Sequence, residues 1–255
     1  MTRACRSLPP RRRLISQTPL SLERRQARPS IFLEDLHSHG TVVDSIPSGQ
    51  RGGVANYSGH NMRAADLARF INRLRVEKPE GSRETPAEAS LVSALMACGA
   101  LRTEKGGTIA AASNKPVVAA VAGSSNAREV RDALLHEAMH MVFYTDDAFA
   151  ERCYAFWDEN MCDAEREAWV TFLRDLQYNV DDRELVVNEL QAYMTTERQL
   201  FGGDAGGKGG GKKGGGGGGG GNEALKEVQA KFAAYIAPHL PSPPSIGTNT
   251  KVVWL

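Results

Sequence analysis

The sequence predicts an α+β fold that is mostly helical, with a small antiparallel β-sheet. Three observations support this class. Apolar residues recur at helical spacing through most of the chain beyond residue 63. Between residues 108 and 121, two short apolar runs are typical of strands instead. Hydrophobic residues make up 41% of the chain, so a core of ordinary size can form. We therefore expect one folded domain over residues 63–201.

The expected helices have recognisable ends. The first covers residues 64–77, where apolar side chains recur every three or four positions. The second follows Thr85, which can cap it in a capping box with Glu88, and Gly99 can close it. Four more helices are expected over residues 127–143, 147–158, 164–177 and 182–200, with Asp163 and Asp181 as N-caps of the last two.

The strand signal lies in two apolar runs, Thr108–Ala112 and Val117–Val121. The tetrapeptide SNKP separates them, and its residues favour a turn. Two apolar runs joined by a turn predict a β-hairpin, or two strands of a small sheet.

The N-terminal region differs from the rest of the chain. Its first 22 residues contain five arginines and no acidic residue, which is typical of an organelle transit peptide. Three prolines in the same stretch oppose an amphipathic helix, so a basic disordered tail is the alternative. Because periodic apolar residues are scarce before position 63, we expect residues 1–62 to be largely disordered.

A glycine tract divides the C-terminal part of the chain. Of the 20 residues from 202 to 221, 15 are glycine. Such a tract cannot form a core, because ordering glycine costs the most entropy and buries no side chain. We expect a flexible linker there, followed over residues 222–255 by an amphipathic helix and tail that pack back on the domain.

Composition argues against several classes of function. The chain has 31 basic and 30 acidic residues, a balance that disfavours general binding to nucleic acid or to membrane surfaces. No apolar run is long enough for a membrane span. The four cysteines are scattered, which is typical of reduced thiols inside a cell. We expect an intracellular protein, either cytoplasmic or, if the N-terminus is a transit peptide, in a plastid or mitochondrion.

The stretch RDALLHEAMHMVFYTDD carries the main functional signal. Its His136, Glu137 and His140 form an H-E-x-x-H pattern within one expected helix. Residues four apart share a helix face, so both imidazoles can reach one ion. Glu137 lies beside that face and can take a proton from water held there. Because the helix is otherwise apolar and should be buried, its polar residues need partners or a ligand. The pattern predicts a zinc site with its general base.

A catalytic zinc ion usually has a third protein ligand, and two residues are candidates here. Asp146 follows His140 by six positions, but Phe143 stands where a glycine usually breaks the helix. Glu189 lies in ELVVNELQAYMTTE, an otherwise apolar helix in which an unpaired carboxylate would be costly to bury. We favour Glu189.

HEAMH together with NELQAYM resembles the zincin metallopeptidases whose third ligand is a glutamate, the gluzincins. The resemblance implies a zincin-like catalytic domain that holds Zn²⁺ through His136, His140 and Glu189, with Glu137 as the general base. The function it implies is hydrolysis of peptide bonds in a peptide or protein substrate. Two short motifs carry the resemblance, not the whole chain.

Two features depart from the pattern of that family. The 48 residues between His140 and Glu189 exceed the compact thermolysin-like spacing, so an additional helical hairpin must intervene. Tyr193 stands where thermolysin-like enzymes carry an aspartate that orients a zinc-bound histidine. Its hydroxyl can hydrogen-bond a ligand or the oxyanion of the reaction, so Tyr193 is a second catalytic candidate.

Other polar residues near the motifs have weaker claims. Tyr144, Tyr154 and Tyr178 can each stabilise an oxyanion, although aromatic residues at helical spacing are more often part of a core. Asp147 and Glu151 can accept hydrogen bonds from the ligand histidines, although a solvated surface is the more common place for such residues.

Two other functions are compatible with the same sequence. A zincin-like protein without activity would bind zinc through the same residues. A helical interaction module would bind no metal and would keep its polar residues hydrogen-bonded within the core. The zinc content of the purified protein distinguishes the interaction module, which would contain no zinc, from the peptidase and the inactive zincin-like protein, which would both contain it.

Overall fold

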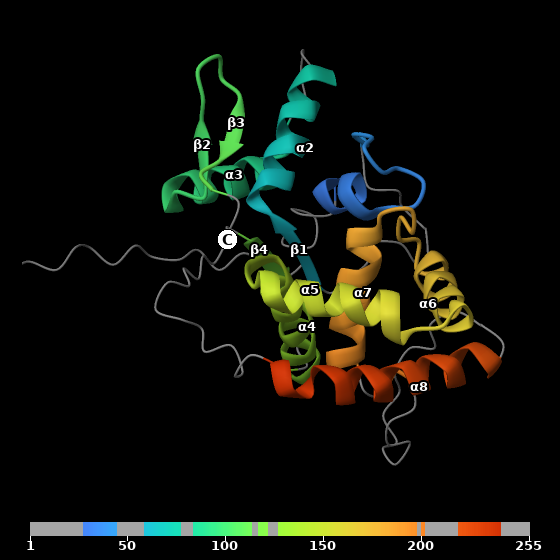
Figure 1. Ribbon diagram of the computed structural model, residues 1–255. Coiled ribbons are helices and arrows are strands. Elements are labelled where there is room, and N and C mark those ends of the chain that lie inside the picture. The colour runs from blue at the N-terminus through green and yellow to red at the C-terminus, as the bar shows by residue number, and fades with distance from the viewer. Residues whose placement is uncertain are drawn as a thin grey trace, which may run out of the picture.

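The computed structural model describes residues 28–44, 59–77, 84–113, 117–121, 127–197, 200–201 and 219–240. Helices dominate these residues, and the strands form two antiparallel sheets of two strands each (Figure 1). The predicted class, a mostly helical α+β fold with little antiparallel sheet, is confirmed. The basic tail before residue 28, most of the glycine tract and the tail after residue 240 lie outside the described residues.

A short helix over residues 28–34 comes first. The elements after it are β1 (Gly59–Arg63), α2 (Ala64–Glu77), α3 (Pro86–Cys98), β2 (Leu101–Thr103), β3 (Ile109–Ala111), β4 (Val117–Val121), α4 (Ala127–Thr145), α5 (Asp147–Ala155), the π-helix η2 (Phe156–Asn160), α6 (Asp163–Asp175), α7 (Arg183–Thr196), α8 (Gly219–Ile236) and the 3₁₀-helix η3 (Ala237–His239). Each helix expected between residues 64 and 200 is present, with ends that differ by a few residues. None of the described helices is long and apolar enough to cross a bilayer.

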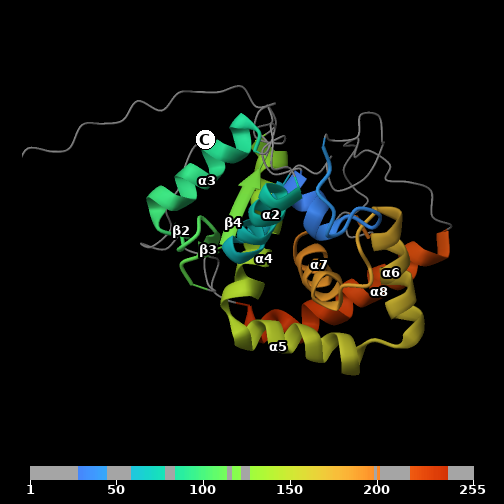
Figure 2. The same ribbon diagram turned by 90° about the horizontal axis from the view of Figure 1, so that it is seen from above.

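Buried side chains form two clusters on either side of α4 and β1. One cluster holds Phe70, Ile71 and Leu91, from α2 and α3, together with residues of β2 and β3. The other lies among α4 to α8 and contains Trp169 and Leu190. Figure 2 shows α2, α3 and the β2–β3 hairpin on one side, with α6, α7 and α8 on the other. Two separate cores therefore meet where α4 runs between them.

The predicted ends of α3 are confirmed. Thr85 and Glu88 form the capping box, in which each side chain accepts a hydrogen bond from the backbone of the other residue. Gly99 ends the helix with a φ of 79°, in the left-handed region that glycine enters without steric penalty.

The N-caps of α6 and α7 each lie one residue from the predicted position. Asp182, not Asp181, caps α7, because its carboxylate accepts from two backbone amides of the first turn. α6 begins after Cys162 rather than after Asp163, because Glu165 reaches back and accepts from the Cys162 backbone amide. In both cases the side chain that satisfies the most amides decides the start of the helix.

β3 and β4 lie within the two predicted apolar runs but do not pair with each other. β3 pairs with β2, and Gly106 and Gly107 in the connection between them both have positive φ. β4 pairs with β1, which precedes α2 and α3 in the chain. The expected hairpin across SNKP is therefore wrong. Two adjacent glycines suit a tight hairpin turn better than SNKP does, because such turns require positive φ.

The expectation that residues 1–62 are disordered is wrong for residues 28–44 and 59–62. Phe32 and Val42 are buried in the cluster with α2 and α3, and the Phe32 ring meets Phe70 edge-on at 5.6 Å between centroids. β1 is fixed by five residue pairs with β4. A few apolar residues are enough here, because α2 supplies a surface against which Phe32 and Val42 can be buried.

α8 lies across α6 and α7 (Figures 1 and 2). Its Leu225, Val228, Phe232 and Ile236 recur at helical spacing and are buried in the same cluster as Trp169. Because α8 begins at Gly219, the last three residues of the tract expected to be linker are helical. α8 thus covers one face of α6 and α7.

Replacing Phe32 tests whether the N-terminal helix is part of the fold. Phe32 is 5% exposed, and we expect Phe32→Ala to lower the free energy of unfolding by about 3–5 kcal/mol, because it leaves a cavity against Phe70. Urea unfolding followed by circular dichroism measures this change. Val76→Ala is the control, since that side chain is 74% exposed and its loss should cost less than about 0.5 kcal/mol. Equal effects of the two substitutions would contradict the packing of residues 28–34.

Candidate metal centre

α4 and α7 lie side by side and bring the two sequence motifs together (Figure 1). α4 buries Met139 and Phe143 in the core, and α7 is buried on nearly all sides. Because residues four apart share a helix face, His136 and His140 both face α7, with ring centroids 4.8 Å apart. Glu189, from the middle of α7, meets them there.

These three side chains form a compact group of metal-ligating atoms. His136 Nε2 lies 3.6 Å from Glu189 Oε2, and His140 Nε2 lies 3.7 Å from Glu189 Oε1. One ligand atom from each residue lies within 4.8 Å of the others. Ligand atoms of a tetrahedral ion with bonds of about 2 Å stand about 3.3 Å apart. The group can therefore hold a metal ion, and no second group of this kind is found in the part of the chain that the structure describes.

Hydrogen bonds behind the rings determine which histidine nitrogen faces the group. His140 Nδ1 lies 3.0 Å from Asn188 Oδ1, which also accepts from Gln191 Nε2. An amide oxygen only accepts, so His140 Nδ1 carries the proton and Nε2 offers a lone pair. His136 Nδ1 lies 3.4 Å from Thr196 Oγ1, whose own proton goes to a backbone carbonyl of α7. Both rings thus present Nε2 as a ligand atom.

The histidines are neutral and the glutamate is short of partners. Burial lowers the pKa of His136 and of His140 to about 4, so both are in the metal-binding form at pH 7. Burial raises the pKa of Glu189, while His140 and a hydrogen bond from Tyr178 act in the opposite direction. Glu189 Oε2 is buried without a hydrogen-bond partner among the described residues. A cation between the three residues would satisfy that oxygen.

Glu137 lies beside the group and is held by β1. Asn61 Nδ2 donates to Glu137 Oε2 at 3.0 Å. The carboxylate also lies directly against Gly59, where an added Cβ would overlap Glu137 Oε1. Burial raises the pKa of Glu137 to about 8; the Asn61 hydrogen bond lowers it, and the nearby Glu189 raises it further. A carboxyl group with a pKa near neutrality can both take up and release a proton.

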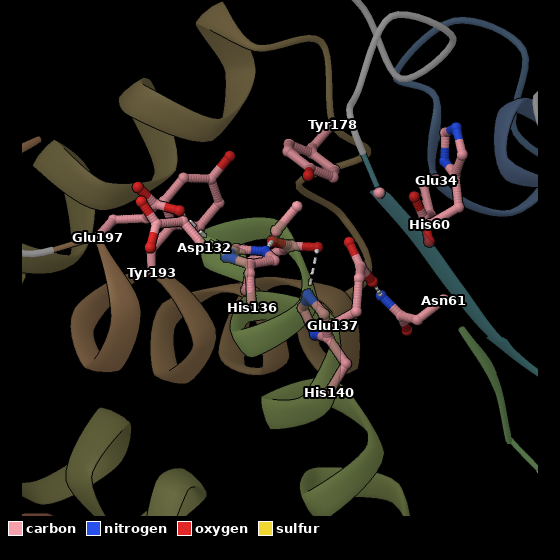
Figure 3. A pocket seen from close by; sticks show the side chains of 13 residues that line it. Glu34, His60, Asn61, Asp132, His136, Glu137, His140, Tyr178, Tyr193 and Glu197 are labelled. Atoms are coloured by element: carbon pink, nitrogen blue, oxygen red, sulfur yellow. Dashed lines mark hydrogen bonds and ion pairs between the residues drawn. The ribbon is translucent and has the colours of Figure 1, made fainter. Parts of the chain in front are cut away.

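A cavity of about 260 Å³ opens onto the group (Figure 3). Three elements supply its walls besides α4: the helix over residues 28–34, β1 and α7. The lining residues are Glu34, Gly59, His60, Asn61, Asp132, Ala133, His136, Glu137, His140, Tyr178, Glu189, Tyr193 and Glu197. The cavity is therefore polar and contains more carboxylates than any other kind of side chain.

The second candidate ligand, Asp146, is not part of the group. Its carboxylate caps α5 by accepting from the Phe149 backbone amide at 3.1 Å. Asp147 and Glu151 are exposed on α5 and do not line the cavity. Of the two sequence alternatives for the third ligand, the structure brings only Glu189 to the histidines.

The tyrosines divide into two pairs. Tyr193 packs edge-on against His136, with centroids 4.8 Å apart, and its hydroxyl is hydrogen-bonded to that of Tyr178. Tyr178 in turn is hydrogen-bonded to Glu189. Tyr144 and Tyr154 do not line the cavity; each ring stacks beneath an arginine instead. Tyr193 thus supports the group indirectly, through Tyr178.

Several site residues gave little signal in the sequence. Glu34, Gly59 and Asn61 fall in the region expected to be disordered, and no motif marks them. Tyr178 follows the end of α6, after Gln177 in a left-handed conformation with φ of 70°. Asn188, next to Glu189 in the NELQAYM motif, was easier to detect, because a buried asparagine in an apolar helix requires partners.

No family model matches the chain, and neither a curated protein nor a solved structure is significantly similar to it. The resemblance to gluzincins therefore rests on the HEAMH and NELQAYM motifs. The geometry of His136, His140 and Glu189 is compatible with it but is not specific to one family.

Removing the amide behind His140 tests its role in metal binding. We expect Asn188→Ala to weaken the affinity for a divalent metal about 10- to 100-fold, because His140 loses the bond that fixes its ring and tautomer. Competition with a chromogenic chelator measures the affinity. Asn72→Ala is the control, since Asn72 bonds the backbone of Ile109 far from the site. An equal loss of affinity in both variants would show that Asn188 acts through stability alone.

Proposed function

We propose that this protein is a zinc-dependent peptidase in which Glu137 is the general base. The observation that carries the proposal is the convergence of His136, His140 and Glu189 beside a carboxylate that is not itself part of the group. A site that only stores or structurally binds zinc usually has four protein ligands. Three ligands next to a separate, restrained carboxylate fit a hydrolytic centre better.

The donor set favours zinc among the common metals. Two neutral imidazoles and one carboxylate suit Zn²⁺, whereas Mg²⁺ and Ca²⁺ prefer oxygen ligands alone. Zinc in such a site lowers the pKa of water toward neutrality and polarises a carbonyl oxygen.

Glu137 and β1 supply the remaining functions. Glu137 is placed to take a proton from the water that attacks the scissile carbonyl carbon, and then to give that proton to the departing amide nitrogen as the C–N bond breaks. Asn61 and Gly59 restrict its carboxylate to that position. Among the described strands β1 pairs only with β4, so an extended peptide along its other edge is a natural substrate. We assign Tyr193 a positioning role, because its hydroxyl is bonded to Tyr178.

Elemental analysis and a peptide-hydrolysis assay test the proposal together. We expect about one zinc per chain and hydrolysis of unfolded casein that a chelator abolishes. Glu137→Gln should keep the zinc and lower kcat about 10²- to 10⁴-fold, because it removes the general base. Glu151→Gln, an exposed glutamate on α5, should leave both unchanged.

The two alternatives give different results in the same experiment. Zinc without hydrolysis of any peptide would indicate an inactive zinc-binding protein. Protein that binds no metal would indicate a helical interaction module and would exclude the proposed mechanism.

Gly59→Ala tests the position of the general base. An added methyl group would overlap Glu137 Oε1, so the carboxylate must move away. We expect the hydrolysis rate to fall about 100-fold while the zinc content stays the same, since a displacement of about 1 Å is enough for such a loss. Steady-state kinetics and elemental analysis of the same sample measure both quantities. Unchanged kinetics would show that Glu137 does not act from the position it occupies against β1.

A further inference from the structure

Ionisation of the carboxyl groups in this cavity would give more negative charge than one metal ion cancels. Five carboxylates line it, and no lysine or arginine does. A divalent cation held by Glu189 would compensate only part of this charge. Like charges in a partly water-excluded cavity repel one another strongly, so a ligand with positive charge is favoured there.

Four of the five carboxylates have a neighbour that accounts for their position. Glu189 belongs to the metal group, and Glu137 accepts from Asn61. Asp132 lies 3.6 Å from Arg128, and Glu197 lies 3.8 Å from His136 Nδ1.

Glu34 is the exception, because no hydrogen bond or ion pair joins its side chain to any residue that the structure describes. Burial raises the pKa of Glu34 well above its usual value, and the nearby carboxylates Glu189 and Glu137 raise it further. The side chain is half-buried, so water solvates it incompletely. A carboxyl group in such surroundings stays protonated unless a cation lies beside it, so a cation is a favourable partner there.

The backbone holds Glu34 firmly in the cavity wall. The Asn179 amide donates to the Glu34 carbonyl at 2.6 Å, and the Leu36 amide donates to the Gln177 carbonyl at 2.8 Å. These bonds tie the end of the helix over residues 28–34 to the segment that carries Tyr178. Figure 3 shows Glu34 on the β1 side of Glu137, away from His136. A substrate with its scissile carbonyl at the metal group would extend past Glu137 toward Glu34.

We propose that Glu34 binds an ammonium group of the substrate, next to the scissile bond. The inference rests on the proposed peptidase function and specifies its substrate class: peptides with a free α-amino group or a lysine side chain at that place. A cavity of about 260 Å³ is small, and an ammonium is a more compact charge than a guanidinium. The ammonium would donate to Glu34 and would also reduce its repulsion with Glu137.

The test measures peptide binding to the zinc-loaded Glu137→Gln protein, which should not cleave its ligand. Calorimetry compares three versions of one short peptide: one with a free N-terminus, one N-acetylated, and one N-acetylated with a lysine before the scissile bond. We expect at least one cationic version to bind about 10- to 100-fold more tightly than the neutral one, as for a charge-assisted hydrogen bond. The cationic peptide that binds more tightly shows whether the ammonium is an α-amino group or a lysine side chain.

Adding Glu34→Gln to this protein should remove the preference, while adding Glu151→Gln should keep it. If the Glu34→Gln variant does not fold, Glu34→Asp replaces it in the test. It should retain the carboxylate and part of the preference for the cationic peptide. Equal binding of all three peptides, or a preference that survives Glu34→Gln, would overturn the inference. Neither result would affect the peptidase proposal, which fails separately if the zinc-loaded wild-type protein hydrolyses no peptide.

Discussion

A carboxylate buried between two helices is the constraint on which this structure depends. Glu189 is 3% exposed, and its Oε2 has no hydrogen-bond partner in the part of the chain described. Burying such a charge is costly unless something compensates it. The two neutral histidines facing it supply lone pairs rather than protons. A cation at the centre of the group would compensate this charge and would join residues of α4 and α7.

The N-terminal segment supplies one wall of the cavity at this group. The helix over residues 28–34 and β1 provide Glu34, Gly59 and Asn61, which close the side of the cavity opposite α7. Their position depends on apolar burial elsewhere, of Phe32 and Val42 against α2. The geometry of the cavity wall therefore depends on packing in the core that α2 and α3 form.

The sequence predicted the parts of the site that follow from helical periodicity. His136 and His140 share a face because they are four residues apart, and Glu189 stood out as a charge in an apolar helix. The strand pairing was not predictable, because β1 lies far from β4 in the chain and carries no periodic signal. Glu34 was missed for a related reason, and Tyr178 was named only as a weak oxyanion candidate. Both positions depend on backbone hydrogen bonds between the end of the helix over residues 28–34 and the segment after α6, and such bonds leave no mark on side-chain pattern.

Tyr193 stands where the resemblance to thermolysin-like enzymes implies an aspartate, and the carboxyl groups of the cavity give a physical reason for a neutral residue there. Four carboxylates already lie near the ligand Glu189, and another aspartate at this position would increase their repulsion. Tyr193 supports the group with a neutral hydroxyl, bonded to Tyr178, and with a ring packed edge-on against His136. Orientation of the ligands is thereby achieved through packing and hydrogen bonds instead of an additional charge. Glu34 is then the one carboxyl group in the wall that no hydrogen bond or ion pair joins to a described residue.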